Sequence, residues 1–274
     1  MLATLVIFLR EGVEASMIVA ILLAYLARSG QRRYFKDVFT GVGAALGLAA
    51  IGGLIAYLTV KTYAGSRVQT IFETCTYVLA AGILTYMTFW MRSHARGLKG
   101  ELQSRADAVL GRGERAGLGL LSFQAVGREG VETVVFTLAI AFSSTRKAGL
   151  LAGAVIGLAI SLLIAFSMYK LGHKMNIGRF FTVVGALLMV FAAGLLVDAV
   201  QNLQQLGWLP VAMHPLWHTG TILSEDSALG DIAHSFFGYA QSPTVLQAVV
   251  YMLYLGFVLA AYFGIMRRVS QRRA

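Results

Sequence analysis

The chain has 274 residues, of which 57% are apolar and only 13% are charged, and its formal net charge is +10. Soluble domains are about one-quarter charged, so this composition is typical of an integral membrane protein. The single cysteine, Cys75, excludes an intrachain disulfide and a cysteine-based metal cluster, and we expect it to be a small buried residue.

Seven hydrophobic segments are long enough to cross a bilayer, which takes about 20 helical residues. We therefore expect an all-α integral membrane protein with seven transmembrane helices, at approximately 2–26, 38–60, 69–91, 116–142, 149–169, 180–200 and 245–266. Arg10 interrupts the first segment, which has no basic residues before it, so we expect this segment to be retained rather than cleaved as a signal peptide.

Two connections between these segments are long. The segment 92–115 mixes charged and small residues and could form a surface helix. The segment 201–244 is rich in aromatic and polar residues, and we expect it to pack over the outer mouth of the protein.

The Lys and Arg residues between the segments indicate the orientation. The loops after the first, third and fifth segments and the C-terminal tail hold 17 of them, and the remaining loops hold 4. Because positive residues concentrate on the cytoplasmic side, we expect the N-terminus outside and the C-terminus in the cytoplasm. This asymmetry also accounts for the net positive charge of the chain, so a nucleic-acid partner is not needed to explain it.

One short motif occurs twice: REGVEA begins at Arg10 and REGVET begins at Arg128, in the first and fourth segments. Three segments separate the copies, so the second copy runs antiparallel to the first. We expect an inverted repeat, with repeat one at about 1–91 and repeat two at about 116–200, followed by the outer loop 201–244 and a seventh helix at 245–266. Such repeats commonly hold substrate near the bilayer midplane at the repeat interface.

Each motif places two carboxylates and a guanidinium on one side of a helix, because residues three and four apart share a face. If the two faces meet, four glutamates and two arginines give a charge of −2, which must be neutralised by protons or a metal ion. Carboxylates suit hard cations, and no His lies within a segment to favour a softer ion. The alternative is that each motif is only a structural ion pair, Arg10–Glu14 or Arg128–Glu132.

Paired R-E-G-x-E sequences in the first and fourth of seven segments resemble the oxidase-dependent iron permease family, especially its bacterial EfeU-type branch. The resemblance implies that four glutamates are iron ligands along the permeation route and that two arginines are essential companions: Glu11, Glu14, Glu129, Glu132, Arg10 and Arg128. Val13 and Val131 stand where Leu is common in the family. The acidic loop motif of eukaryotic members has no clean match.

The resemblance also implies an inner-membrane location, iron as the transported substrate and no permanently bound cofactor. It further implies an extracytoplasmic partner that handles iron. In bacteria this is a cupredoxin-like protein and a haem peroxidase, and in eukaryotes it is a multicopper oxidase.

Other acids and histidines are weaker candidates for metal binding. Glu73 and Asp198 lie near the expected outer ends of their segments and could concentrate cations there, or could be hydrated interfacial residues. The outer loop holds further residues that could capture a metal, although we favour a solvated loop: His214, His218, Glu225, Asp226, Asp231 and His234.

Small residues recur at helical spacing in two segments. Gly149, Gly153 and Gly157 form one ridge, and Gly43 and Gly47 form another. Such ridges let helix backbones approach closely in lipid, so we expect both to pack within the molecule.

Other functional classes remain as alternatives to an iron permease. The carboxylates could serve a permease for another hard divalent metal, or a proton-coupled carrier of an organic cation. An intramembrane hydrolase could use paired glutamates to activate water, but it would usually need a His at membrane depth. Metal transport explains the symmetric pairing best, and we expect no enzymatic activity.

Overall fold

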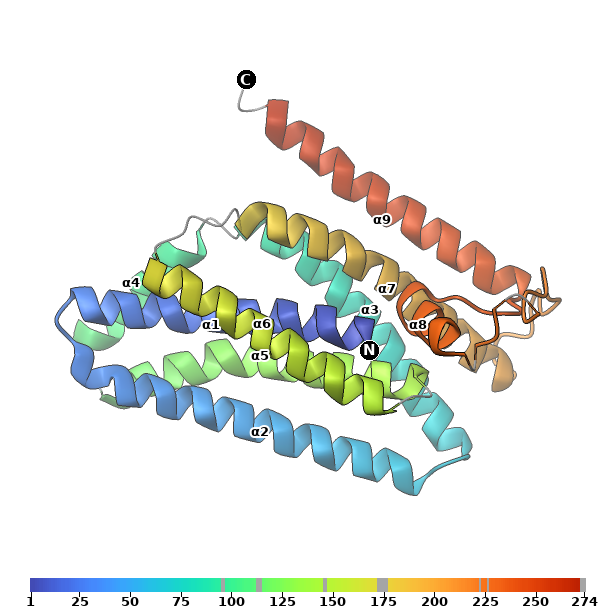
Figure 1. Ribbon diagram of the computed structural model, residues 1–274, viewed down its shortest axis with the longest axis horizontal. Helices are drawn as coiled ribbons and strands as arrows, with labels where there is room; N and C mark the ends of the chain where they lie inside the picture. Colours follow the sequence, from blue (N-terminus) through green and yellow to red (C-terminus); the bar gives the residue numbers. More distant parts are fainter. Residues whose placement is uncertain are drawn as a thin grey trace.

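The computed structural model describes residues 1–94, 97–111, 115–144, 147–171, 177–221, 223–225 and 227–271. Within them the chain is almost entirely helical (Figure 1). The helices are α1 (Leu2–Arg28), α2 (Phe35–Thr62), α3 (Arg67–His94), α4 (Leu98–Gly111), α5 (Arg115–Ser143), α6 (Lys147–Leu171), α7 (Ile177–Gln205), α8 (Ala228–Phe237) and α9 (Val245–Gln271), with a short 3-10 turn, η1 (Arg32–Tyr34), before α2.

Helices occupy all seven segments expected to span the membrane. Within the described residues, five of them are both long and apolar enough to cross a membrane: α2, α3, α6, α7 and α9. Helices α1 and α5 are as long, with 27 and 29 residues, but each carries the three charged residues of a motif. The protein is an all-α, multi-pass membrane protein.

The helices pair across the two halves of the chain. Helix α1 packs most extensively on α6, α2 on α5, and α3 on α7, while α1 and α5 also contact each other (Figure 1). Each of the first two helices of one half therefore lies against a helix of the other half. An inverted repeat would require this pairing of helices across the two halves, and the repeat itself stays a prediction.

Two apolar clusters hold the bundle together at opposite ends. One joins α1, α3, α5 and α7 to Phe236 of α8. The other joins the C-terminal half of α1 to α2, α4 and the start of α5, through Leu22, Leu102 and Leu118. The segment expected to form a surface helix is thus α4, with Leu102 and Ala106 buried against its neighbours.

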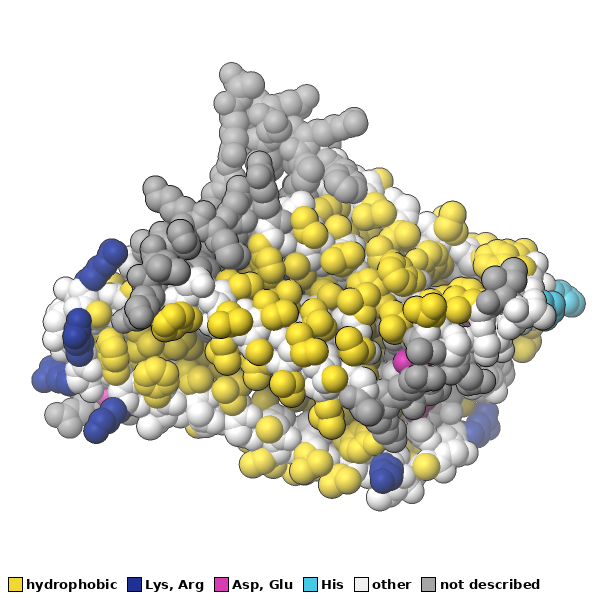
Figure 2. Space-filling view, in the orientation of Figure 1, with side chains coloured by type: hydrophobic (Ala, Val, Ile, Leu, Met, Phe, Trp, Pro, Cys, Tyr) yellow, Lys and Arg dark blue, Asp and Glu magenta, His cyan; other side chains and the backbone are white. Residues whose placement is uncertain are grey.

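The middle of the molecule exposes large apolar side chains, as expected for contact with lipid. Leu151 and Phe257 are 73% and 76% exposed. In Figure 2 hydrophobic side chains cover this middle zone, and Lys and Arg gather at the end where α1 turns into α2. Cys75 is exposed rather than buried, so that expectation was wrong, because its side of α3 faces away from the other helices.

Helix α8 lies across one end of the bundle and contacts α1, α5 and α7. The Ser227 hydroxyl accepts a hydrogen bond from the Gly230 amide at its start (2.9 Å), and Gly238 ends it at a φ of 67°. A side chain at Gly238 would collide with the backbone of Gly194 on α7. This close contact fixes α8 against α7, so the segment 201–244 packs on the bundle; that this end is the outer mouth stays a prediction.

The two glycine ridges differ in what they face. A Cβ at Gly153 would collide with the carbonyl oxygen of Met1, and one at Gly157 with that of Leu5, so this ridge allows α6 to pack on the backbone at the start of α1. Gly43 and Gly47 have no described atom within 4 Å of such a Cβ, so the expected packing there was wrong. The close approach on α2 is made instead by Gly41, against the backbone of Gly119.

Candidate metal site

The first motif lies inside α1 with its charged side chains buried. Arg10 is only 2% exposed. Its Nε donates a hydrogen bond to Glu14 Oε1 at 3.1 Å, and its Nη1 lies 3.3 Å from Glu11 Oε1. One guanidinium therefore bridges both carboxylates of its own motif, one turn apart on the helix.

The second motif repeats only part of this arrangement. Arg128 Nε donates to Glu132 Oε1 at 3.0 Å, but the Arg128 side chain is 42% exposed. Its guanidinium stacks over the Trp90 ring at 4.9 Å, and Nη2 donates to Met87 Sδ. Both of these contacts come from α3, so Arg128 is held from outside its own helix. Glu129 has no ion pair with Arg128 in the described residues.

The two motifs meet between α1 and α5. Glu11, Glu14 and Glu129 are all buried, and one carboxylate oxygen from each lies within 4.8 Å of the others. We call these three residues the central cluster. Glu132 lies outside this group but its charge acts on Glu11, Glu14 and Arg10.

Several polar atoms of the site lack a hydrogen-bond partner among the described residues. They are both carboxylate oxygens of Glu11, Oε2 of Glu129 and of Glu132, and Nη1 and Nη2 of Arg10. Buried carboxylates without donors are costly, and a bound cation is one way to satisfy them. Carboxylate oxygens in this arrangement suit a hard or borderline divalent cation.

The glycines of the motifs allow neighbouring helices to approach. A Cβ at Gly12 would lie 2.8 Å from Ser161 Cβ on α6, and one at Gly130 would lie 2.9 Å from Ala49 Cβ on α2. Real Cβ atoms essentially never come this close. Each motif glycine thus lets a helix of the other half pack directly beside the carboxylates.

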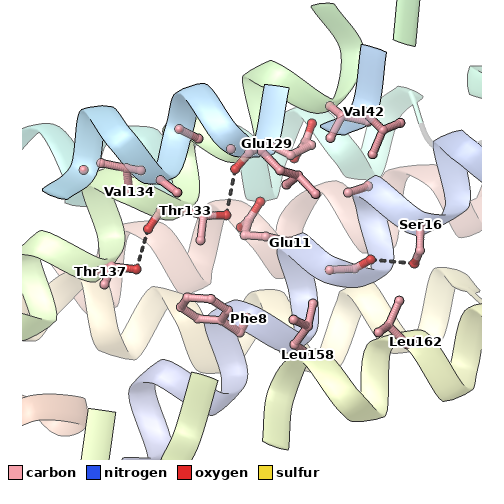
Figure 3. A pocket seen from close by; sticks show the side chains of 18 of the residues that line it. Phe8, Glu11, Ser16, Val42, Glu129, Thr133, Val134, Thr137, Leu158 and Leu162 are labelled. Carbon is pink, nitrogen blue, oxygen red and sulfur yellow. Dashed lines mark hydrogen bonds between the residues drawn. The ribbon is translucent and has the colours of Figure 1, made fainter. Parts of the chain in front are cut away.

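A cavity of about 1190 Å³ opens beside the central cluster, between α1, α2, α5 and α6 (Figure 3). Eight residues of α1 and eight of α5 line it, and each α5 residue lies 118 positions after one from α1. Glu11 and Glu129 form one such pair. The Thr133 hydroxyl donates its hydrogen bond to the backbone carbonyl of Glu129, at 2.7 Å, rather than to a carboxylate of the cluster.

The two acids expected at the outer mouth lie on neighbouring helices. Glu73 on α3 is half-buried and accepts a hydrogen bond from Gln69 Nε2 at 2.7 Å. Asp198 on α7 is buried, and its Oδ1 lies 3.7 Å from Nε2 of His234 on α8. The two residues lie 36 positions apart, and no sequence pattern indicated that they would meet.

The other candidate residues of the outer loop are dispersed. His214 is exposed, and His218 is exposed with Nδ1 2.7 Å from Ser242 Oγ. Glu225 accepts from the Gln241 amide at 2.6 Å, and Asp231 accepts from the Ser144 hydroxyl at 3.2 and 3.3 Å. Asp226 lies outside the described residues. The contacts of Glu225 and Asp231 hold the loop in place.

Sequence reasoning missed the residues that hold Arg128. Trp90 and Met87 lie three residues apart on α3 and so share a face, which is a helical pattern visible in the sequence. Nothing in the sequence indicated that this face meets the second motif.

Comparison with known proteins identifies the family of the chain. The model of the iron permease FTR1 family matches residues 1–273. Proteins named ferrous iron permease EfeU from Escherichia coli O6:H1 (strain CFT073) and from Yersinia pestis are each 33% identical to the chain. They align with 96% of it and with 95% and 93% of their own lengths, respectively. No solved structure matches the chain. The protein therefore belongs to the iron permease FTR1 family, a family of permeases rather than of enzymes.

Proposed function

We propose that this protein imports ferrous iron across the cytoplasmic membrane, which is the inner membrane in a cell that has two. The iron site is formed by four motif glutamates near the bilayer midplane: Glu11, Glu14, Glu129 and Glu132. The observation that carries the proposal is the buried central cluster, in which carboxylates of two helices come within 4.8 Å of one another. The ferrous state is taken from the names of the relatives.

The charges of the site fit a divalent cation. Arg10 pairs with Glu14 and Arg128 pairs with Glu132, so these charges cancel. Two negative charges remain, which equal and oppose the charge of one ferrous ion. The arginines are therefore compatible with a metal site, because Arg10, although it contacts Glu11 as well as Glu14, balances only one negative charge.

Packing supports an inverted repeat around this site. Gly153 on α6 faces Met1 and Thr4, while Gly41 on α2 faces Gly119 and Ser122. The contacted residues differ by 118 positions in each case, as do the two motifs. The same contact is thus made twice, once in each half, which is what a two-fold axis through Glu11 and Glu129 would require.

The proposal includes seven spans, with α1 and α5 crossing the bilayer in addition to the five apolar helices. Their buried charged residues face each other rather than lipid, which is how transmembrane helices tolerate ionisable groups. The N-terminus and α8 then lie on the outer side of this membrane, and α4 lies in the cytoplasm. We expect an extracytoplasmic iron-handling partner at the outer face, of the cupredoxin-like, haem peroxidase or multicopper oxidase kind.

Iron uptake into proteoliposomes tests the proposal. With iron kept ferrous under anaerobic, reducing conditions, Glu11→Gln and Glu129→Gln should each lower uptake by at least about 100-fold. Each variant removes one negative ligand of the ion, and loss of one partner of a buried charge pair, here a carboxylate and the cation, costs about 3–5 kcal/mol. Glu101→Gln is the matched control, since Glu101 is exposed on α4 and its ion pair within the described part of the chain is with Arg105. Wild-type uptake in either cluster variant would contradict the proposal, and preferred uptake of another divalent metal would replace iron as the substrate.

A further inference from the structure

A second metal-ligating pair lies outside the central cluster, where α8 covers the end of α7. Asp198 Oδ1 and His234 Nε2 are 3.7 Å apart. This distance exceeds the usual hydrogen-bond range of about 2.7–3.2 Å. It fits two atoms that bind one ion between them, since bonds of about 2.0–2.2 Å from each ligand allow a separation of up to about 4 Å.

The imidazole of His234 is oriented for this role. Its Nδ1 lies 2.8 Å from the carbonyl oxygen of Tyr239, an acceptor, so Nδ1 carries the proton and donates it. In the neutral ring Nε2 then presents its lone pair towards Asp198. A metal-ligating histidine is commonly held in this way, by a hydrogen bond from its other nitrogen to a backbone carbonyl.

The Asp198 carboxylate is available to a cation. Its side chain is 9% exposed, and no hydrogen bond from the described residues reaches it. Apart from His234, the charges that act on it are those of Glu225 and Glu73, both negative. With a neutral imidazole, none of these groups supplies a positive charge to balance the buried carboxylate, and a bound cation would do so.

We infer that Asp198 and His234 form an outer binding site for a divalent transition-metal cation, with Glu225 and Glu73 adding negative charge around it. Mixed carboxylate and imidazole ligands suit manganese, ferrous iron and zinc. The presence of a metal site here does not depend on the proposed function. The identity of the ion, iron on its way to the central cluster, does rest on it.

Manganese binding to the purified protein in nanodiscs tests the inference, because this ion reports its ligands by pulsed electron paramagnetic resonance. The central cluster has only carboxylates, so coupling between manganese and a histidine nitrogen distinguishes the outer site. We expect that coupling in the wild type, in Glu129→Gln and in His214→Gln, the last being an exposed histidine of the same loop. His234→Gln, whose amide can still donate to the Tyr239 carbonyl, should abolish the coupling.

Asp198→Asn provides the second test, since it keeps the shape of the side chain and removes its charge. It should weaken manganese binding at the histidine-coupled site at least 10-fold and leave the carboxylate-only signal unchanged. Absence of nitrogen coupling in the wild type, or its persistence in His234→Gln, would overturn the inference. If Glu129→Gln loses the carboxylate-only signal and keeps the nitrogen coupling, the central cluster has lost its metal and the outer site still binds manganese, as the inference expects.

Discussion

Glu11 on α1 and Glu129 on α5 occupy the same position in two copies of one motif, and their carboxylates approach to within 4.8 Å in the interior of the protein. At an effective dielectric constant of about 20, two such negative charges repel by roughly 3.5 kcal/mol. A divalent cation between them turns this repulsion into attraction. Under the proposed function, the geometry of the two halves therefore favours binding of a divalent substrate between them.

The two arginines should differ in their tolerance of lysine. Arg10 is buried and bridges two carboxylates, whereas Arg128 is partly exposed and contacts Glu132, Trp90 and Met87. An ammonium cannot reproduce the planar fork of a guanidinium. We expect Arg10→Lys to lower iron uptake by on the order of 100-fold and Arg128→Lys by about 10-fold, measured in proteoliposomes at equal protein incorporation. Full uptake by the double variant would show that neither guanidinium positions a ligand.

Replacing either motif glycine, even with alanine, should destabilise the protein. A Cβ at Gly12 or Gly130 would displace α6 or α2 from the carboxylates, and overpacking of this kind costs about 1–3 kcal/mol. We expect lower thermal stability and lower uptake for Gly12→Ala and Gly130→Ala. Gly47→Ala, on an open face of α2, should be neutral or slightly stabilising. Equal behaviour of all three variants in a thermal melt would contradict the packing argument.

The orientation can be measured with single cysteines in a Cys75→Ser background. Thr221→Cys lies in the outer loop, and Ser104→Cys lies on the exposed side of α4. A membrane-impermeant maleimide applied to spheroplasts should label Thr221→Cys at once and Ser104→Cys only after permeabilisation. The reverse order of labelling would invert the topology.

The membrane potential should drive uptake without ATP. An inside-negative potential contributes about 2.3 kcal/mol per charge per 100 mV, or roughly 4.6 kcal/mol for a divalent ion, enough for accumulation on the order of a thousandfold. The sequence has no G-x-x-x-x-G-K-[ST] nucleotide-binding signature. We expect uptake to rise with an imposed potassium-diffusion potential in liposomes. Uptake that followed only a pH gradient would indicate electroneutral proton exchange.

Much of the fold could be predicted from the sequence, because long apolar runs and helical spacing act locally. The helix positions, the pairs Arg10–Glu14 and Arg128–Glu132, and the membrane class all follow from residues close together in the chain. The glycine ridge at 43 and 47 was mispredicted because spacing alone does not reveal which face of α2 meets another helix.

The pairing of Asp198 with His234 could not be predicted. It depends on how the loop after α7 folds back, which is set by contacts such as Gly238 against Gly194 and Glu225 with the Gln241 amide. The unequal burial of Arg10 and Arg128 is likewise a tertiary effect, since the two motifs are the same from the arginine through the second glutamate. Among the described contacts, Arg10 meets the two acids of its own motif, whereas Arg128 meets one acid of its motif together with Trp90 and Met87 of α3.

The most direct test of the central claim is a double-mutant cycle on ferrous iron affinity with Glu11→Gln and Glu129→Gln. It is carried out by anaerobic equilibrium dialysis of nanodisc samples in a His234→Gln background, so that the outer pair does not contribute. If both carboxylates hold one ion, each single variant should lose nearly as much affinity as the double variant, because removing either ligand disrupts the shared site. Additive losses, or wild-type affinity in either single variant, would contradict the account.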